Sequence, residues 1–161
     1  MQRALKVARH PSETMERLWL RLLAYCWLYE DGLAFAGAIC EPEEPDLKAE
    51  DPTGRVALWV RVGKSEPAKI RRAVTQNGGP KVAVLFESAE RLQAFLAEAR
   101  EEKVTHLERA ELAAVDAALL RELAKRDARR MKVAVTIAGD HFYVDVDGES
   151  FDGALSRAGA G

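Results

Sequence analysis

The sequence predicts a mixed α/β fold in which helices flank a β-sheet and a β-hairpin follows near the C-terminus. Strand-like and helix-like segments alternate as far as about residue 126, which is typical of sheets with parallel strands. Apolar residues make up 48% of the 161, enough to fill one substantial core. Two alternating apolar segments then flank Gly139 and Asp140, a pair typical of tight turns. We therefore predict one domain over residues 1–152 and a frayed tail over residues 153–161.

The first third of the chain is expected to contain the central helix of the domain. Pro11 suits the first turn of a helix, and apolar residues recur at helical spacing from Met15 to Tyr29. Asp31 and Gly32 then end the helix, and the segment 41–46 is too rich in proline to form another. We expect a strand over residues 3–9, a helix from Glu13 to about Tyr29, and a short strand or extended segment over residues 33–40.

The rest of the chain alternates between strands and helices. Residues 56–62 form an apolar run with one charge, typical of a buried strand, and Ser65 to Pro67 begin a helix that Gly78 to Pro80 end. Ser88 is a suitable N-cap for the next helix. We further expect strands over residues 81–86 and 104–108, a helix from about Glu111 to Arg126, and a hairpin over residues 131–138 and 142–147.

The net charge and the two cysteines limit the classes of protein to which this sequence can belong. The net charge of −2 excludes a protein that coats nucleic acid by bulk electrostatics, although a local basic strip remains compatible with focused binding. Cys26 and Cys40 lack the spacing of a zinc site and are expected to be two buried, unlinked thiols. The sequence lacks the pattern of a secretory leader and has no apolar run of the ~20 residues that cross a membrane, so we expect a cytoplasmic protein without a membrane partner.

Four sequence blocks resemble those of the YaeQ family in order and spacing, from the N-terminus to about residue 87. The blocks are Ala8 to Thr14 with Glu16, Arg17 and Arg21 to Ala24; Glu44 to Asp46; Leu58 to Val60 with Gly63; and Lys69 to Ala73 with Thr75 and Gln76. YaeQ proteins are assigned by resemblance to the PD-(D/E)XK phosphodiesterase fold. The resemblance therefore implies a restriction-endonuclease-like mixed sheet, in which one helix and two strands bring acidic residues to one end.

The resemblance also implies a degenerate catalytic site. Glu13 matches the acid on the helix and Asp46 the first acid of the strands, but the second strand acid is replaced by Arg61. The lysine usual two residues later is replaced by Gly63. Because a guanidinium repels Mg²⁺ and pairs readily with a carboxylate, we expect Arg61 to pair with Asp46 or Glu13. The missing cation would then come from the following segment, and its candidates are Lys64, Lys69, Arg71 and Arg72.

Three functional hypotheses follow from these residues. The first is a catalytically impaired nuclease-like domain that needs no cofactor and binds a nucleic acid or a protein partner. Its candidate nucleic-acid-binding residues are Lys64, Lys69, Arg71, Arg72 and Gln76. The second is a Mg²⁺-dependent nuclease in which Glu13 and Asp46 bind the metal, Glu44 or Glu16 adds a third carboxylate, and Lys69 or Arg72 supplies the cation. The third is an interaction protein without a nucleic-acid role, which the negative net charge favours.

Each candidate residue also has a structural interpretation. Glu13 could stabilise the start of a helix and pair with Arg17 four residues later. Asp46 could be a turn residue that follows Pro45. The basic residues from Lys64 to Arg72 could form an ordinary solvated helix face.

Overall fold

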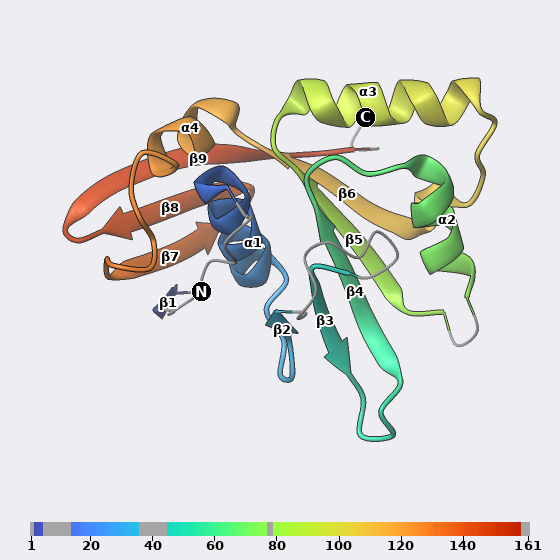
Figure 1. Cartoon of the computed structure of the whole chain (residues 1–161), viewed down its shortest axis with the longest axis horizontal. Helices are drawn as coiled ribbons and strands as arrows, with labels where there is room; N and C mark the ends of the chain where they lie inside the picture. Colours follow the sequence, from blue (N-terminus) through green and yellow to red (C-terminus); the bar gives the residue numbers. More distant parts are fainter. Residues whose placement is uncertain (1, 5–13, 36–44, 77–78, 159–161) are drawn as a thin grey trace.

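The computed structural model describes residues 2–4, 14–35, 45–76 and 79–158, and it confirms the mixed α/β fold (Figure 1). The strands of the described residues form one nine-stranded sheet in the order β1-β7-β8-β9-β6-β5-β4-β3-β2. These strands are β1 Gln2–Ala4, β2 Ala34–Phe35, β3 Leu47–Glu50, β4 Val56–Val62, β5 Lys81–Phe86, β6 Ala110–Val115, β7 Val133–Ala138, β8 His141–Val146 and β9 Glu149–Arg157. The helices are α1 Met15–Trp27, α2 Pro67–Thr75, α3 Ala89–Glu101 and α4 Ala117–Leu123, with a 3₁₀ turn over Leu107–Arg109.

The centre of the sheet is parallel and its flanks are antiparallel. Strands β4, β5 and β6 run parallel to one another, as their alternation with α2 and α3 predicts. Every other neighbouring pair of strands is antiparallel. The predicted hairpin is present as β7 and β8, and Figure 1 shows that the β7–β9 part of the sheet lies at the opposite end from β3 and β4.

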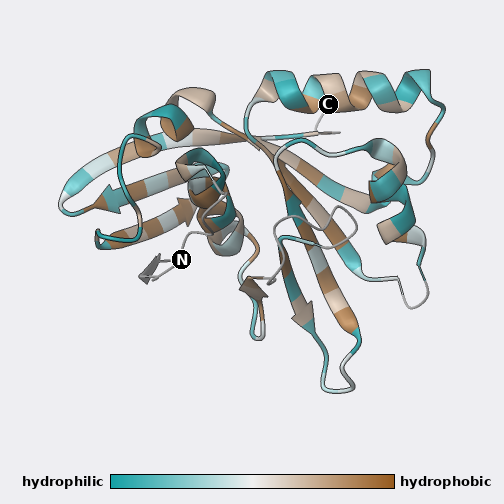
Figure 2. Ribbon diagram, viewed as in Figure 1, coloured by the Kyte–Doolittle hydropathy of each residue, from teal (hydrophilic) through white to brown (hydrophobic). Residues whose placement is uncertain are grey.

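The helices cover the sheet on two faces and create two hydrophobic cores. One core packs α1 and α4 against the sheet, and the other packs α2 and α3 against the opposite face of β4–β6. Side chains alternate along β4, so Leu58, Val60 and Val62 belong to the first core and Trp59 to the second. Figure 2 shows hydrophobic residues along the central strands.

Helix α1 is the central helix, as its apolar pattern predicts. The Thr14 side chain accepts a hydrogen bond from the Arg17 backbone N–H at 3.1 Å and caps the helix. Most of the following residues are buried, and Trp19 is fully buried with its indole N–H donating to the carbonyl of Arg126 at 3.0 Å. The expected start at Glu13 lies outside the described residues, and the helix ends at Trp27, two residues before Tyr29.

The predicted strand and helix of residues 104–126 are present in that order, but their predicted bounds are wrong. Residues 104–106 form a loop before the 3₁₀ turn, the strand is β6, and the helix α4 begins only at Ala117. Residues 112–115 are buried on both faces of the sheet, so apolar residues follow one another without alternation. Such a run does not show the period that would distinguish a strand from a helix. The actual start of α4 is set by Asp116, whose side chain accepts a hydrogen bond from the Ala118 N–H at 2.9 Å.

Strand β9 contradicts the predicted frayed tail. Residues 153–157 continue β9, which pairs with β8 along one edge and with β6 along the other. Leu155 in this segment is buried. Strand β9 therefore joins the hairpin to the parallel centre, and β3 is a second strand that the sequence does not predict.

The structure bears on the predicted state of the cysteines and on the predicted absence of a membrane-spanning segment. Cys26 is buried on α1 and not in a disulfide, as predicted, whereas Cys40 lies outside the described residues. Within the described ranges, every helix is too short or too polar to cross a lipid bilayer.

Gly153→Ala should destabilise the protein, because α4 packs directly on the backbone of β9. A Cβ at position 153 would lie 2.8 Å from the Cβ of Leu119 and 3.0 Å from the Cβ of Asp116. We expect a loss of about 1–3 kcal/mol in the free energy of unfolding, measured by urea denaturation. The exposed neighbour Ala154 offers a control, since Ala154→Ser should change stability by less than about 0.5 kcal/mol. Equal stability of Gly153→Ala and wild type would contradict this packing.

The Cys26 thiol should react slowly with a thiol reagent, because its residue is only 2% exposed in the first core. The measurement uses a Cys40→Ser variant, in which Cys26 is the one remaining cysteine of the sequence. Labelling should accelerate sharply when urea unfolds the protein. Rapid labelling under native conditions would show that this part of α1 is open to solvent.

Candidate functional site

An ion pair between Arg17 and Asp46 joins α1 to the strands at the predicted catalytic position. Arg17 Nη2 donates to Asp46 Oδ1, and Arg17 Nη1 donates to the carbonyl of Val62 at 3.2 Å. The other carboxylate oxygen of Asp46 accepts the Val62 N–H at 2.9 Å. The Asp46 side chain is 6% exposed and that of Arg17 is 27% exposed. The Asp46 carboxylate is therefore buried, paired and hydrogen-bonded through both of its oxygens.

Asp46 was expected to pair with Arg61 or to have a metal as its partner, but its charged partner in the structure is Arg17. The Asp46 N–H donates to the carbonyl of Val60 at 2.8 Å, which places Asp46 beside β4. Residues alternate along β4, so Val60 and Val62 face α1 while Trp59 and Arg61 face α2. Arg17 thus forms the ion pair with Asp46 that was one of the two expected for Arg61. The structure does not describe Glu13, the other predicted partner.

The described donors around Asp46 do not fit a divalent cation. Both oxygens of Asp46 are already engaged, one with a guanidinium that would repel a metal ion. Within residues 14–35, 45–76 and 79–158, no group of three or more histidine, cysteine, aspartate or glutamate side chains could hold a metal. Of the predicted third carboxylates, Glu16 is exposed on α1 and Glu44 lies outside the described residues.

Gly63, where the PD-(D/E)XK pattern predicts a lysine, lies between Arg17 and Glu87. Its φ of +77° is in the left-handed region, where a side chain would be strained. A Cβ there would lie 3.5 Å from Arg17 Nη1 and 3.9 Å from Glu87 Oε2. Glu87 follows β5 and pairs with Arg91 Nε at 3.2 Å. No sequence motif marks Glu87, and only the parallel pairing of β4 with β5 brings it beside Gly63.

Several candidate binding residues surround a pocket between β4 and the first half of α2, here named the β4–α2 pocket. Its volume is about 270 Å³. It is lined by Trp59, Arg61, Lys64, Ser65, Glu66, Lys69 and Ile70. Trp59 and Ile70 are buried and belong to the second core, so they provide an apolar base beneath the polar side chains.

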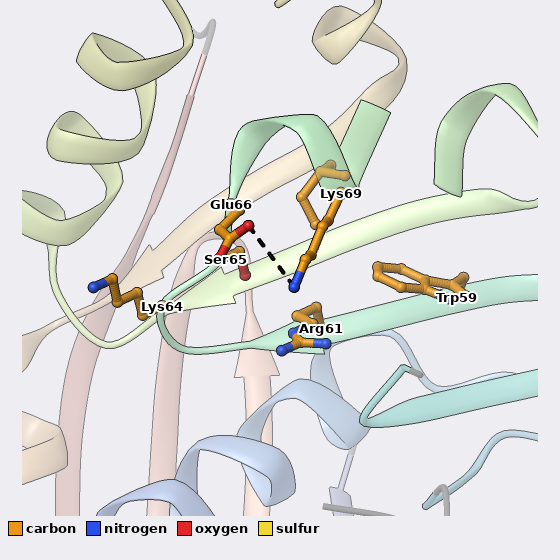
Figure 3. A pocket seen from close by; sticks show the side chains of 7 residues that line it. Trp59, Arg61, Lys64, Ser65, Glu66 and Lys69 are labelled. Carbon is orange, nitrogen blue, oxygen red and sulfur yellow. Dashed lines mark ion pairs between the residues drawn. The ribbon is translucent and has the colours of Figure 1, made fainter. Parts of the chain in front are cut away.

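The polar part of the β4–α2 pocket carries more positive than negative charge. Figure 3 shows the Lys69 amine between Glu66 and the Arg61 guanidinium, whereas Lys64 extends away from them. Lys69 Nζ pairs with Glu66 at 3.8 Å, and the Glu66 side chain is 61% exposed. Ser65 is held in place because its hydroxyl donates to the carbonyl of Gly63 at 3.2 Å. The described lining residues of the pocket thus include three cations and one carboxylate, an arrangement suited to an anionic group.

The remaining predicted residues lie outside this pocket. Arg71 and Arg72 are exposed on α2, and Gln76 is exposed directly after it. Arg71 and Arg72 line a different hollow, together with Thr75, at the loop that follows α3. The structure therefore divides the basic candidate residues between two hollows beside α2, whereas Asp46 pairs with Arg17 of α1.

Removal of Arg17 should cost far more stability than removal of an exposed cation. Arg17→Met leaves the buried Asp46 carboxylate without its charged partner, and we expect a loss of about 3 kcal/mol in the free energy of unfolding. Asp46→Asn should cost less, because the amide oxygen still accepts the Val62 N–H and Arg17 can turn toward solvent.

The matched control for this prediction is Arg91→Met. It breaks the more exposed pair with Glu87 and should cost less than about 1 kcal/mol. All three variants are compared with wild type by urea denaturation. Similar stabilities of Arg17→Met and Arg91→Met would show that the Asp46 carboxylate does not depend on Arg17.

Comparison with known proteins places the chain in a family. The family model described as "YaeQ protein" matches residues 1–154. The YaeQ protein of Escherichia coli (strain K12) is 37% identical over 73 residues, which cover 45% of this chain and 40% of that protein. The chain thus spans about two fifths of the length of this curated relative.

Two solved structures are similar to this one throughout. The crystal structure of the YaeQ protein from Xanthomonas axonopodis pv. citri has a TM-score of 0.82 and 25% identity, covering 96% of this chain and 86% of that one. The YaeQ protein from Pseudomonas syringae has a TM-score of 0.81 and 28% identity, covering 96% and 84%. With the family model matched over residues 1–154, these similarities show that the chain belongs to the YaeQ family.

Proposed function

We propose that this YaeQ-family chain binds the phosphodiester backbone of a single nucleic-acid strand at the β4–α2 pocket and does not cleave it. The observation that carries the proposal is the placement of Arg61, Lys64 and Lys69 around one hollow, where Glu66 is the one carboxylate among the described lining residues. This function follows from local charge, because the net charge of the whole chain is −2.

The cations of the pocket match the chemistry of a phosphodiester. The guanidinium of Arg61 can donate two parallel hydrogen bonds to phosphate oxygens, and the ammonium of Lys69 adds a compact positive charge. Glu66 pairs with Lys69 at 3.8 Å, a long and solvent-exposed contact that a phosphate can displace at low cost. A pocket open on the surface admits a flexible single strand more readily than a rigid duplex.

The state of Asp46 supports binding without metal-dependent cleavage. The PD-(D/E)XK resemblance assigns Asp46 to a metal site, but its buried carboxylate is neutralised by Arg17 and hydrogen-bonded to Val62. Of the basic residues that would contact phosphate, Arg61 lies on the α2 side of β4 and Lys69 lies on α2 itself. In this proposal Asp46 has a structural role, and the nucleic acid binds on the opposite face of the sheet.

Substitution of the pocket cations should weaken the binding of a labelled single strand. At 0.1 M salt, Arg61→Gln and Lys69→Gln should each lower the affinity about fivefold, because a single-strand phosphate contact contributes about 0.7 to the salt slope. Fluorescence anisotropy with single-stranded DNA and RNA measures both the affinity and the slope. Arg121→Gln is the matched control, since it removes an exposed charge from α4, which lies far from α2 in Figure 1.

Two outcomes would contradict the proposal. Equal affinities of Arg61→Gln, Lys69→Gln and Arg121→Gln would show that the pocket does not contact the strand. Cleavage of the strand by the wild type in Mg²⁺ or Mn²⁺, abolished in Asp46→Asn, would favour the nuclease hypothesis instead.

A further inference from the structure

A second basic hollow lies across α2 from the β4–α2 pocket and is here named the α2–α3 hollow. Its volume is about 410 Å³. It is lined by Ala68, Arg71, Arg72, Thr75, Glu102, Lys103, Val104 and Thr105. Its described lining residues provide three cations, two hydroxyl groups and one carboxylate, and the hollow lies between α2 and the loop that connects α3 to β6.

Hydrogen bonds hold Arg71 at the edge of this hollow. Arg71 Nε donates to the hydroxyl oxygen of Thr105 at 3.3 Å, and that oxygen lies 2.9 Å from Nδ1 of His106. The Thr75 hydroxyl donates to the backbone carbonyl of Arg71 at 2.9 Å. The contact with Thr105 uses Nε, and the other N–H donors of the guanidinium are on its two terminal nitrogens. Arg71 is thus oriented by a neighbouring segment and can still donate two hydrogen bonds to a phosphate.

The end of α3 fixes the position of Lys103. The Lys103 N–H donates to the carbonyl of Arg100 at 3.2 Å, and the Val104 N–H donates to that of Ala99 at 2.9 Å. Lys103 has a φ of +56°, the left-handed conformation that commonly closes a helix. The exposed ammonium of Lys103 therefore extends from a well-defined turn that faces Arg71 across the hollow.

The two cavities are connected by a line of cations over the exposed side of α2. Lys69 lines the β4–α2 pocket, and Arg72, three residues later, lines the α2–α3 hollow. Side chains three residues apart are neighbours on a helix surface, about 5–6 Å apart at Cβ. Basic groups therefore continue from Arg61 through Lys69 and Arg72 to Arg71 and Lys103.

We propose that the α2–α3 hollow binds a second phosphate group of the strand that occupies the β4–α2 pocket, so that the strand crosses α2. This inference rests on the proposed function and adds a path and a minimum length for the ligand. The path crosses a helix whose diameter with side chains is about 10–12 Å, so a very short oligonucleotide cannot reach both sites.

The test compares oligothymidylates of about four and about fifteen nucleotides, lengths at the two ends of common single-strand site sizes. In the double variant Arg71→Gln/Lys103→Gln, affinity for the long strand at 0.1 M salt should fall about 25-fold and its salt slope by about 1.4, since two phosphate contacts are lost. The affinity for the short strand, which is bound in the β4–α2 pocket, should fall by less than about twofold. The double variant Arg121→Gln/Lys125→Gln removes two exposed charges at α4 and should leave both affinities unchanged.

The outcomes separate this inference from the function on which it rests. Arg61→Gln could weaken the binding of both strands while Arg71→Gln/Lys103→Gln weakens the binding of neither. That result would contradict the second phosphate site and leave the proposed binding at the β4–α2 pocket intact. An equal loss for short and long strands in Arg71→Gln/Lys103→Gln would also overturn the crossing path. If wild-type protein binds neither strand, both proposals fail. Arg71→Lys keeps the charge without the planar fork, and a smaller loss than in Arg71→Gln would support phosphate contact.

Discussion

The buried ion pair between Arg17 and Asp46 fixes the relative positions of α1, β3 and β4. Each partner also bonds to the backbone of Val62, so the pair ties the start of one strand to the end of another beneath the helix. A carboxylate that is 6% exposed is stable only with such partners, because an unpaired buried charge is costly. The pair therefore constrains the backbone from which Gly63 and Ser65 lead into α2.

The alternation of side chains along β4 places two kinds of chemistry on opposite faces of one strand. Val60 and Val62 face α1, where Asp46 is neutralised, while Trp59 and Arg61 face α2 and its basic residues. A one-residue shift of β4 would exchange these faces. Its pairing with β3 on one side and β5 on the other opposes such a shift, because both cores would lose their apolar contacts.

Helix α2 concentrates positive charge on a chain whose net charge is negative. Its buried side packs in the second core through Ile70, Ala73 and Val74, and its cations lie on the remaining surface. Both basic hollows adjoin this one helix, one formed with β4 and the other with the loop after α3. An anionic chain would therefore meet α2 at short range, where screening by salt is weakest.

The sequence by itself determined the features that depend on local pattern. The apolar period of α1, the cap at Ser88, the parallel centre and the turn between β7 and β8 all follow from neighbouring residues. The sequence also identified Asp46 and the basic residues of α2, through blocks similar to those of YaeQ proteins.

Only the tertiary structure decided which distant residues meet. Residues 110–115 form a strand instead of a helix because they pair with β5 and β9, and residues 153–157 extend β9 for the same reason. Asp46 pairs with Arg17 because β3 and α1 lie together, whereas the alternation of β4 directs Arg61 to the other face. Spacing along a chain describes contacts within an element, but the partner of a buried charge depends on how separate elements pack.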